Sequence, residues 1–244
     1  GWGVEQNEMY ASVISSKLGV PTYNVASPGT DVCGYQALLA RMPQSVRPAA
    51  VIVGLVLEND MLEYDCRADA EEDIVLFLQE REDPGVTGIK ILLTRNSALY
   101  NFLAISLKRV DLIRNALTAI GIINTEHVYK RFFTEETIDM VAASTGEELT
   151  RLKAMLPQGT PFGVLVAPGR FEIRDGDPPY RKMRLKIGEE LAQRGIGVID
   201  PYQGFMAAGF QSTHFTHDGH WTPLGHQIAA AAAAKWLNSH LGEK

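Results

Sequence analysis

The sequence has little of several features that would assign it to a class at once. Only two cysteines, Cys33 and Cys66, occur in 244 residues, which excludes a disulfide-rich scaffold and allows either one bridge or two thiols. The longest strongly apolar run, residues 49–57, is far shorter than the roughly 20 residues of a membrane-spanning helix. Residues 1–8 do not show the charged and apolar regions of a targeting segment. We therefore expect no transmembrane segment in this chain.

Positive charge is also scarce. The chain has 29 acidic and 23 basic residues, a formal net charge of −6, and no basic run that could follow a phosphate backbone, so nucleic acid is not an expected partner. A hydrophobic content of 45% with 21% charged residues is ordinary for a globular chain. We expect a single large domain over residues 1–244.

Hydrophobic periodicity predicts helices that alternate with buried strands. Apolar β-branched runs predict strands at 48–57, 161–168 and 196–200, and a shorter strand is expected at 22–26. Helical spacing predicts helices at 5–18, 34–42 and 179–194, and a last helix that begins after Thr222. Such alternation is typical of an α/β fold, a three-layer α/β/α sandwich with a parallel sheet. Ligands of such folds collect at the carboxyl ends of the strands.

Residues 61–157 interrupt this alternation with mainly helical patterns. We interpret this stretch as a helical insertion after the strand that ends at Leu57. Two interpretations remain open for it. It is either an extra helical layer on the sheet or a cap over the site, because insertions at strand ends often border ligands.

Three turns that follow strands, or lie near the expected site, carry residues suited to acyl chemistry. Asp218 and His220 stand two residues apart in DGHW, where an aspartate can orient a histidine that acts as general base. Gly29 and Asn59 can supply the backbone N–H and the side-chain amide that stabilise an oxyanion. We therefore take these four residues as candidate catalytic residues and oxyanion donors.

With these residues in this order, the chain resembles the SGNH/GDSL hydrolase superfamily. Gly29 in NVASPGT looks like the second motif of that family, Asn59 in LENDM like the third, and DGHWTPLGH like the last. The resemblance implies a flavodoxin-like sheet and a serine esterase or O-acyltransferase that needs no metal or organic cofactor. The D-x-H-W form is similar to extracytoplasmic relatives that acetylate or deacetylate polysaccharides. It therefore favours a carbohydrate ester as substrate and a periplasmic or extracellular location.

The chain departs from the family pattern at three places. Leu57 stands where the third motif has a glycine, and Asp218 precedes His220 by two residues where three are more usual. The largest departure is that no Gly-Asp-Ser occurs in the chain. In the family this motif ends the first strand, which lies in the middle of a sheet of order 2-1-3-4-5. We therefore expect the nucleophile and its strand upstream of Gly1 in the sequence. In the sheet, we expect that strand to lie between the strands at 22–26 and 48–57.

Several alternatives stay open. Ser27 follows a predicted strand and is a second candidate nucleophile, although turn serines are common. His214, His217 and His220 have a spacing that a zinc site could use, and their simpler interpretation is a set of loop histidines. His226 is expected near the same loop, and for Cys33 and Cys66 unpaired thiols are the simpler expectation. A carbohydrate-binding or scaffold protein without the nucleophile is the alternative function.

Overall fold

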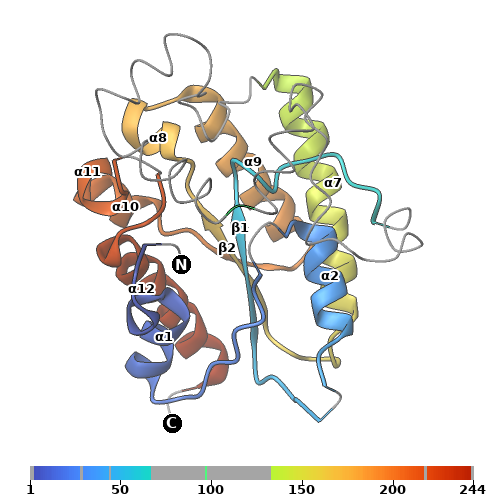
Figure 1. Cartoon of the computed structure of the whole chain (residues 1–244). Coiled ribbons are helices and arrows are strands. Elements are labelled where there is room, and N and C mark those ends of the chain that lie inside the picture. Colours follow the sequence, from blue (N-terminus) through green and yellow to red (C-terminus); the bar gives the residue numbers. More distant parts are fainter. Residues whose placement is uncertain are drawn as a thin grey trace. The chain divides into compact units, whose positions relative to one another are not determined.

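The computed structural model describes residues 3–27, 30–43, 45–66, 97, 133–216 and 219–242. The chain divides into two compact units, Gly1–Phe77 with Arg131–Lys244, and Leu78–Lys130. All the helices and strands given below belong to the first unit. Figure 1 shows its strands in the centre with helices to either side.

Three parallel strands form the sheet of the described residues. They are β1 (Val51–Val56), β2 (Phe162–Ala167) and β3 (Gly197–Ile199), in the order β1-β2-β3. Val51 pairs with Phe162, and Gly163 pairs with Gly197. The strands predicted at 48–57, 161–168 and 196–200 are thus confirmed in shorter form, and so is the mixed α/β class with a parallel sheet.

Long helices pack on both faces of this sheet. One face is covered by α2 (Val32–Ala40), α7 (Glu135–Ala154) and α9 (Pro178–Gln193), whose apolar side chains join one hydrophobic cluster. The other face is covered by α1 (Tyr10–Leu18) and α12 (Pro223–Leu241), which belong to a second cluster. Val51, Val53 and Leu55 of β1 belong to the first cluster and Ile52 to the second, because side chains of a strand point to opposite faces in turn.

Shorter helices connect these layers. A 3-10 turn, η1 (Gln6–Glu8), precedes α1, so the helix predicted at 5–18 starts later than expected. Three further helices, α8, α10 and α11, were not predicted because each is short; they are Arg170–Asp175, Tyr202–Ala208 and Phe210–Thr213. Two of them follow the carboxyl ends of β2 and β3.

The last helix shows how local sequence fixes its start and its packing. Thr222 is the N-cap, its side chain accepts a hydrogen bond from the amide of Gly225, and a proline follows at the first helical position. Further along, the indole of Trp236 lies against two glycines of the sheet. A Cβ on Gly163 or Gly197 would lie 2.9 or 2.5 Å from atoms of that indole, so neither position has room for a side chain.

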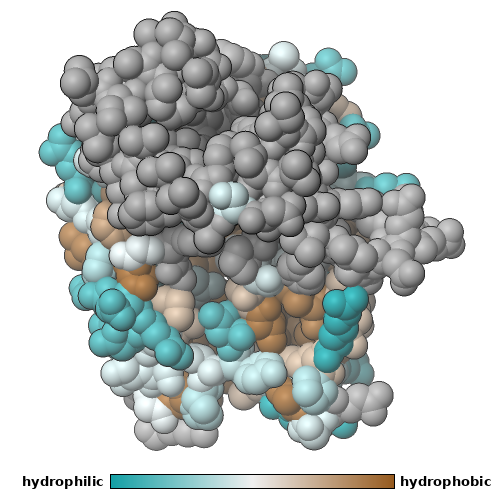
Figure 2. Space-filling model, viewed as in Figure 1, coloured by the Kyte–Doolittle hydropathy of each residue, from teal (hydrophilic) through white to brown (hydrophobic). Residues whose placement is uncertain are grey.

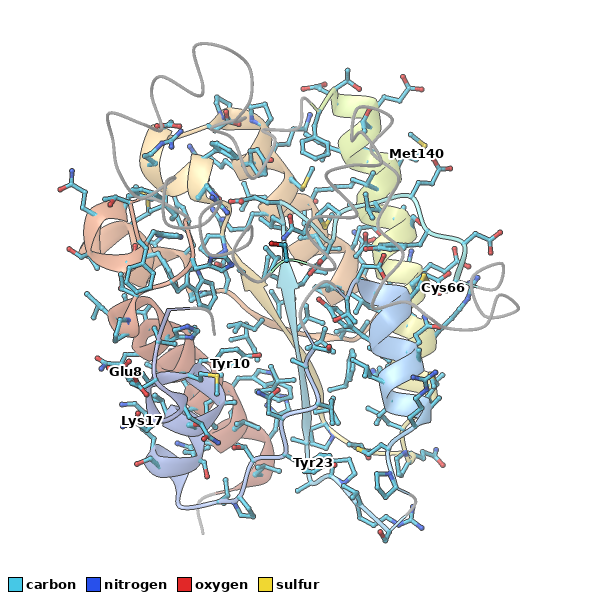
Figure 3. All side chains as sticks on the ribbon, in the orientation of Figure 1. Glu8, Tyr10, Lys17, Tyr23, Cys66 and Met140 are labelled. Carbon is cyan, nitrogen blue, oxygen red and sulfur yellow. A yellow bond between two sulfur atoms is a disulfide. The ribbon has the colours of Figure 1, made fainter. Side chains whose placement is uncertain are left out.

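The strand expected at 22–26 does not form. These residues carry no strand pairing, and the segment is exposed, with Tyr23 66% accessible (Figure 3). Among the described residues β1 therefore has one neighbouring strand, β2, and its other edge has none. The segment is too short to decide by itself between a strand and an extended loop, and without a partner strand it is a loop.

The insertion expected at 61–157 lies mostly outside the described residues. Its last part is α7, a helix as expected for this stretch, and α7 packs against α9 and α2. Ile138 and Leu149 of α7 are buried in the cluster that covers the sheet. For α7 the interpretation as a helical layer is therefore the one that fits, whereas the question of a cap concerns residues outside the described part.

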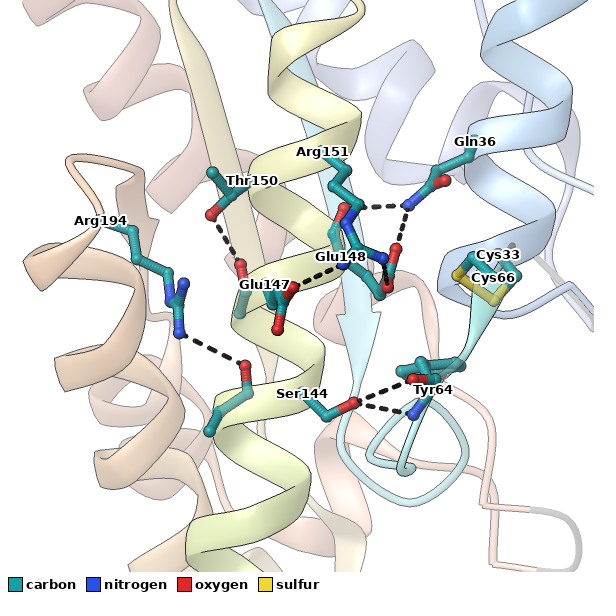
Figure 4. Close-up of polar contacts among 12 residues, drawn as sticks. Cys33, Gln36, Tyr64, Cys66, Ser144, Glu147, Glu148, Thr150, Arg151 and Arg194 are labelled. Atoms are coloured by element: carbon teal, nitrogen blue, oxygen red, sulfur yellow. Dashed lines mark hydrogen bonds and ion pairs between the residues drawn. A yellow bond between two sulfur atoms is a disulfide. The ribbon is translucent and has the colours of Figure 1, made fainter. Parts of the chain in front are cut away.

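A disulfide and a polar network hold α2, α7 and the segment after β1 together (Figure 4). Cys33 and Cys66 are bonded to each other, so the expectation of unpaired thiols was wrong. The amide of Tyr64 donates to the hydroxyl of Ser144 on α7 at 2.8 Å. Spacing in the sequence could not reveal the bridge, because the two cysteines meet only when the turn after β1 folds back toward α2.

Candidate active site

Charged residues line the carboxyl edge of the sheet. Glu58 follows β1, Arg170 follows β2 and Asp200 follows β3. Arg184 of α9 donates hydrogen bonds to Glu172 of α8 and to Asp200. Ion pairs therefore connect the segments that leave the three strands, as expected for the edge at which parallel α/β folds place their sites.

A tight turn after β1 presents Asn59 to solvent. The amides of Asn59 and Asp60 donate to the carbonyl of Val56, and the amide of Val56 donates to Oδ2 of Asp60 at 2.7 Å. Asp60 is buried, whereas Asn59 is exposed. Residues 61–65 are not helical, so neither residue caps a helix. The turn leaves the Asn59 amide accessible to a ligand.

Tyr35 of α2 stabilises this turn through hydrogen bonds of its hydroxyl. Its hydroxyl lies 2.9 Å from Oδ2 of Asp60 and 3.3 Å from the carbonyl of Gly54 in β1. Burial, followed by the negative charge of Asp60, raises the pKa of Tyr35 well above its ordinary value. The phenol therefore stays protonated and remains a donor to the carboxylate at all physiological pH values.

Gly29 lies outside the described residues, so its part in an oxyanion hole stays a prediction. The carbonyl of Ser27 accepts a hydrogen bond from the hydroxyl of Thr30 at 2.6 Å, which supports the interpretation of Ser27 as a turn residue. Asp31 then caps α2 by accepting from the amide of Gly34.

His220 lies in a loop between α11 and α12, which we call the His220 loop (residues 214–221). His217 and Asp218 of this loop lie outside the described residues. His214 and Trp221 form an antiparallel bridge across its base, and the amide of Phe215 donates to the carbonyl of His220 at 2.8 Å. His220 itself is exposed. The imidazole is thus accessible, as a general base must be.

Arg170 joins the turn after β1 to the His220 loop. Its Nε donates to Oε2 of Glu58 at 2.7 Å, and its backbone amide donates to the other oxygen of the same carboxylate. Its guanidinium also lies against Gly219, because a Cβ built there would be 2.0 Å from Nη1. Since Glu58 is adjacent to Asn59 and Gly219 is adjacent to His220, this arginine brings the two predicted site segments to one end of the sheet.

Two further histidines of the region are buried and neutral. Burial, together with the positive charge of Arg170, lowers the pKa of His214 to about 4, and its Nδ1 lies 2.9 Å from the Thr213 hydroxyl. Burial lowers the pKa of His226 to about 4 as well, and its Nδ1 accepts from the amide of Tyr10. Both rings pack among aromatic side chains. They serve as structural residues that support the loop, as their simpler interpretation held.

The zinc hypothesis finds no support within the described chain. No group of three or more histidine, cysteine or acidic side chains in that part has a metal-binding arrangement. His214 is held by Thr213 and stacked on Phe210, with ring centroids 4.7 Å apart. His217 lies outside the described residues, so its contribution was not tested.

Sequence reasoning overlooked Glu58 and Arg170. Both come shortly after buried strands, as Asn59 does, and both are charged residues at positions where the chain leaves the core. Their opposite charges could have suggested a pair, because the carboxyl ends of neighbouring parallel strands meet at one edge. The contact of Arg170 with Gly219 had no signal in the sequence.

Searches for similar proteins gave no support to any family. No family model, no curated protein and no solved structure matched the chain. Among the described residues, no helix is long and apolar enough to cross a membrane.

Proposed function

We propose that this protein is a serine esterase or O-acyltransferase of the SGNH type that acts on an ester, with a carbohydrate ester as the favoured substrate. His220 is the general base, Asp218 orients it, and Gly29 and Asn59 donate hydrogen bonds to the oxyanion. The fold of the proposal is a three-layer α/β/α sandwich with a flavodoxin-like sheet. No metal or organic cofactor takes part.

One observation carries the proposal. Arg170 contacts both Glu58 and Gly219, which are the sequence neighbours of Asn59 and His220. An amide donor and an imidazole base, each exposed, therefore come from segments that one side chain links at the carboxyl edge of the sheet. Acyl transfer requires this combination, because the base activates the nucleophile while the amide stabilises the charge that develops on the ester oxygen.

The nucleophile in this proposal is a serine on a strand that pairs with the second edge of β1. Val51 directs its amide toward β2, so the backbone groups of Ile52 and Gly54 face the other edge. Figure 2 shows hydrophobic residues exposed in the lower part of this face. Val56, the last residue of β1, is 40% exposed. A further strand, placed upstream of residue 1 in the sequence, would cover this surface and end beside Asn59.

The disulfide supports the proposed cellular location of the protein. Bridges persist in oxidising environments, so Cys33–Cys66 supports the proposed periplasmic or extracellular location.

The test uses a longer chain that includes the residues encoded before Gly1. We expect it to hydrolyse an aryl acetate, and we expect His220→Ala to abolish that activity while His240→Ala, at the exposed end of α12, leaves it unchanged. Activity should persist in the presence of a chelator. The proposal fails if the longer chain has no serine after its added strand, or if His220→Ala retains full activity. A chain without activity that still binds an acetylated polysaccharide would instead indicate the non-catalytic alternative.

A further inference from the structure

Arg170 is held more firmly than an ordinary surface arginine. Its side chain is 18% exposed and that of Glu58 is 5% exposed. The carboxylate accepts from both the backbone amide and Nε of the same residue. Because both the main chain and the side chain are fixed by one partner, the direction of the guanidinium plane is set by the end of β1.

The His220 loop is shaped to receive this guanidinium. Gly219 has φ +69°, a conformation that favours glycine, and a Cβ there would lie 2.0 Å from Nη1 and 2.4 Å from Cζ. The amide of Gly219 donates to the carbonyl of Phe215 at 2.9 Å, which fixes Gly219 relative to the start of the loop. With any other residue at 219, either the loop or the Arg170 guanidinium would have to move.

We propose that Arg170 is a positioning residue: it clamps the His220 loop to the end of β1 and thereby sets the imidazole opposite the Asn59 amide. This inference rests on the proposed function and adds a residue to it. Arg170 acts through Gly219 and Glu58 and takes no part in the chemical step. A misplacement of about 1 Å in a catalytic group reduces turnover by about 100-fold, which is the scale of effect the clamp prevents.

Lysine could not replace the arginine in this role. A lysine ammonium could pair with Glu58, but it has no planar group to lie against the Gly219 backbone. Arg170→Lys should therefore keep the ion pair with Glu58 and lose the contact with Gly219. Arg151 on α7 offers a matched control, because it pairs with Glu148, whose side chain is 3% exposed and thus as buried as that of Glu58. The Arg151 pair lies between α7 and α2 (Figure 4).

The experiment compares amide hydrogen exchange in wild type, Arg170→Gln and Arg151→Gln. We expect exchange at Phe215 and Gly219 to speed up by about tenfold or more in Arg170→Gln, while the β2 amides stay protected. Arg151→Gln should leave both loop amides unchanged. If Arg170→Gln does not fold, Arg170→Lys supplies the same comparison. Equal exchange of the loop amides in wild type and the Arg170 variant would overturn the inference.

A kinetic measurement on the longer chain distinguishes positioning from substrate binding. Arg170→Lys is expected to lower kcat by about 100-fold with little change in KM. A higher KM with unchanged kcat would overturn the inference, since Arg170 would then bind substrate directly. If the wild-type longer chain has no ester activity, the proposed function fails, and the exchange comparison alone decides on the clamp.

Discussion

The Cys33–Cys66 bridge makes a prediction about stability whose size follows from the fold. The bond joins residues 33 positions apart, from the start of α2 to the segment after the Asn59 turn. The bridge restricts the unfolded chain, and for a loop of this length the chain-entropy relation gives about 3.7 kcal/mol of stabilisation at 25 °C. In a domain of this size, that corresponds to a decrease in Tm of about 7–15 °C on reduction.

Urea unfolding of the oxidised protein and of the reduced, thiol-blocked protein measures this difference. The Cys33→Ala/Cys66→Ala variant gives a second comparison that has no reagent attached. The unfolded oxidised chain is also more compact, so its m-value should be lower than that of the reduced chain. Alkylation of the oxidised protein under denaturing conditions should detect no free thiol.

A matched variant separates the covalent bond from the other contacts of the same segment. Ser144→Ala removes a hydrogen bond to the amide of Tyr64 but leaves the bridge in place, and it should cost about 1 kcal/mol. The reasoning is refuted if reduction changes the free energy of unfolding by less than about 1 kcal/mol. It is also refuted if the unreduced protein reacts with two equivalents of alkylating agent.

Two further predictions concern packing and pH. Gly197→Ala places a methyl group 2.5 Å from the Trp236 indole and should lower the free energy of unfolding by about 1–3 kcal/mol in chemical denaturation. Gly188→Ala in α9 is its control, since that Cβ would meet only a methyl group of Val198 at 3.9 Å, and it should raise stability by about 0.5–1 kcal/mol. His214 and His226 titrate near 4 in the folded state and near 6.5 when unfolded, so the unfolded chain binds more protons between these values. The free energy of unfolding should therefore fall as pH drops from 6.5 to 4, by up to about 3 kcal/mol for each imidazole. His214→Phe should weaken this dependence. A free energy of unfolding that does not change over this range would contradict the assignment of buried neutral histidines.

Strong local patterns could be predicted from the sequence. The run at 48–57 is apolar and β-branched along its whole length, and a strand buried on both faces is the simplest way to satisfy it. Thr222 followed by a proline predicted the start of α12, and the helix predicted to end at residue 18 does end there, with Gly19 at φ 63° as its C-cap. Each of these depends on a few neighbouring residues, which is why one sequence is enough.

The same information failed where structure depends on a distant partner. Residues 22–26 have the composition of a strand, but a strand forms only when an adjacent strand accepts its hydrogen bonds, and none is present beside them in the described part of the chain. The bridge between Cys33 and Cys66 was equally undecided, because no local pattern tells whether two cysteines will meet.

For the candidate site, too, one part could be predicted from the sequence and another depended on the tertiary structure. The sequence by itself determined which residues are chemically suited to the proposed reaction, since the nature and order of Asn59 and His220 do not depend on folding. Only the tertiary structure decided that their segments share one edge of the sheet, because Arg170 reaches Glu58 on one side and Gly219 on the other. Arg170 is 112 positions from Glu58 along the chain. The two residues meet only once the parallel strands have aligned their carboxyl ends.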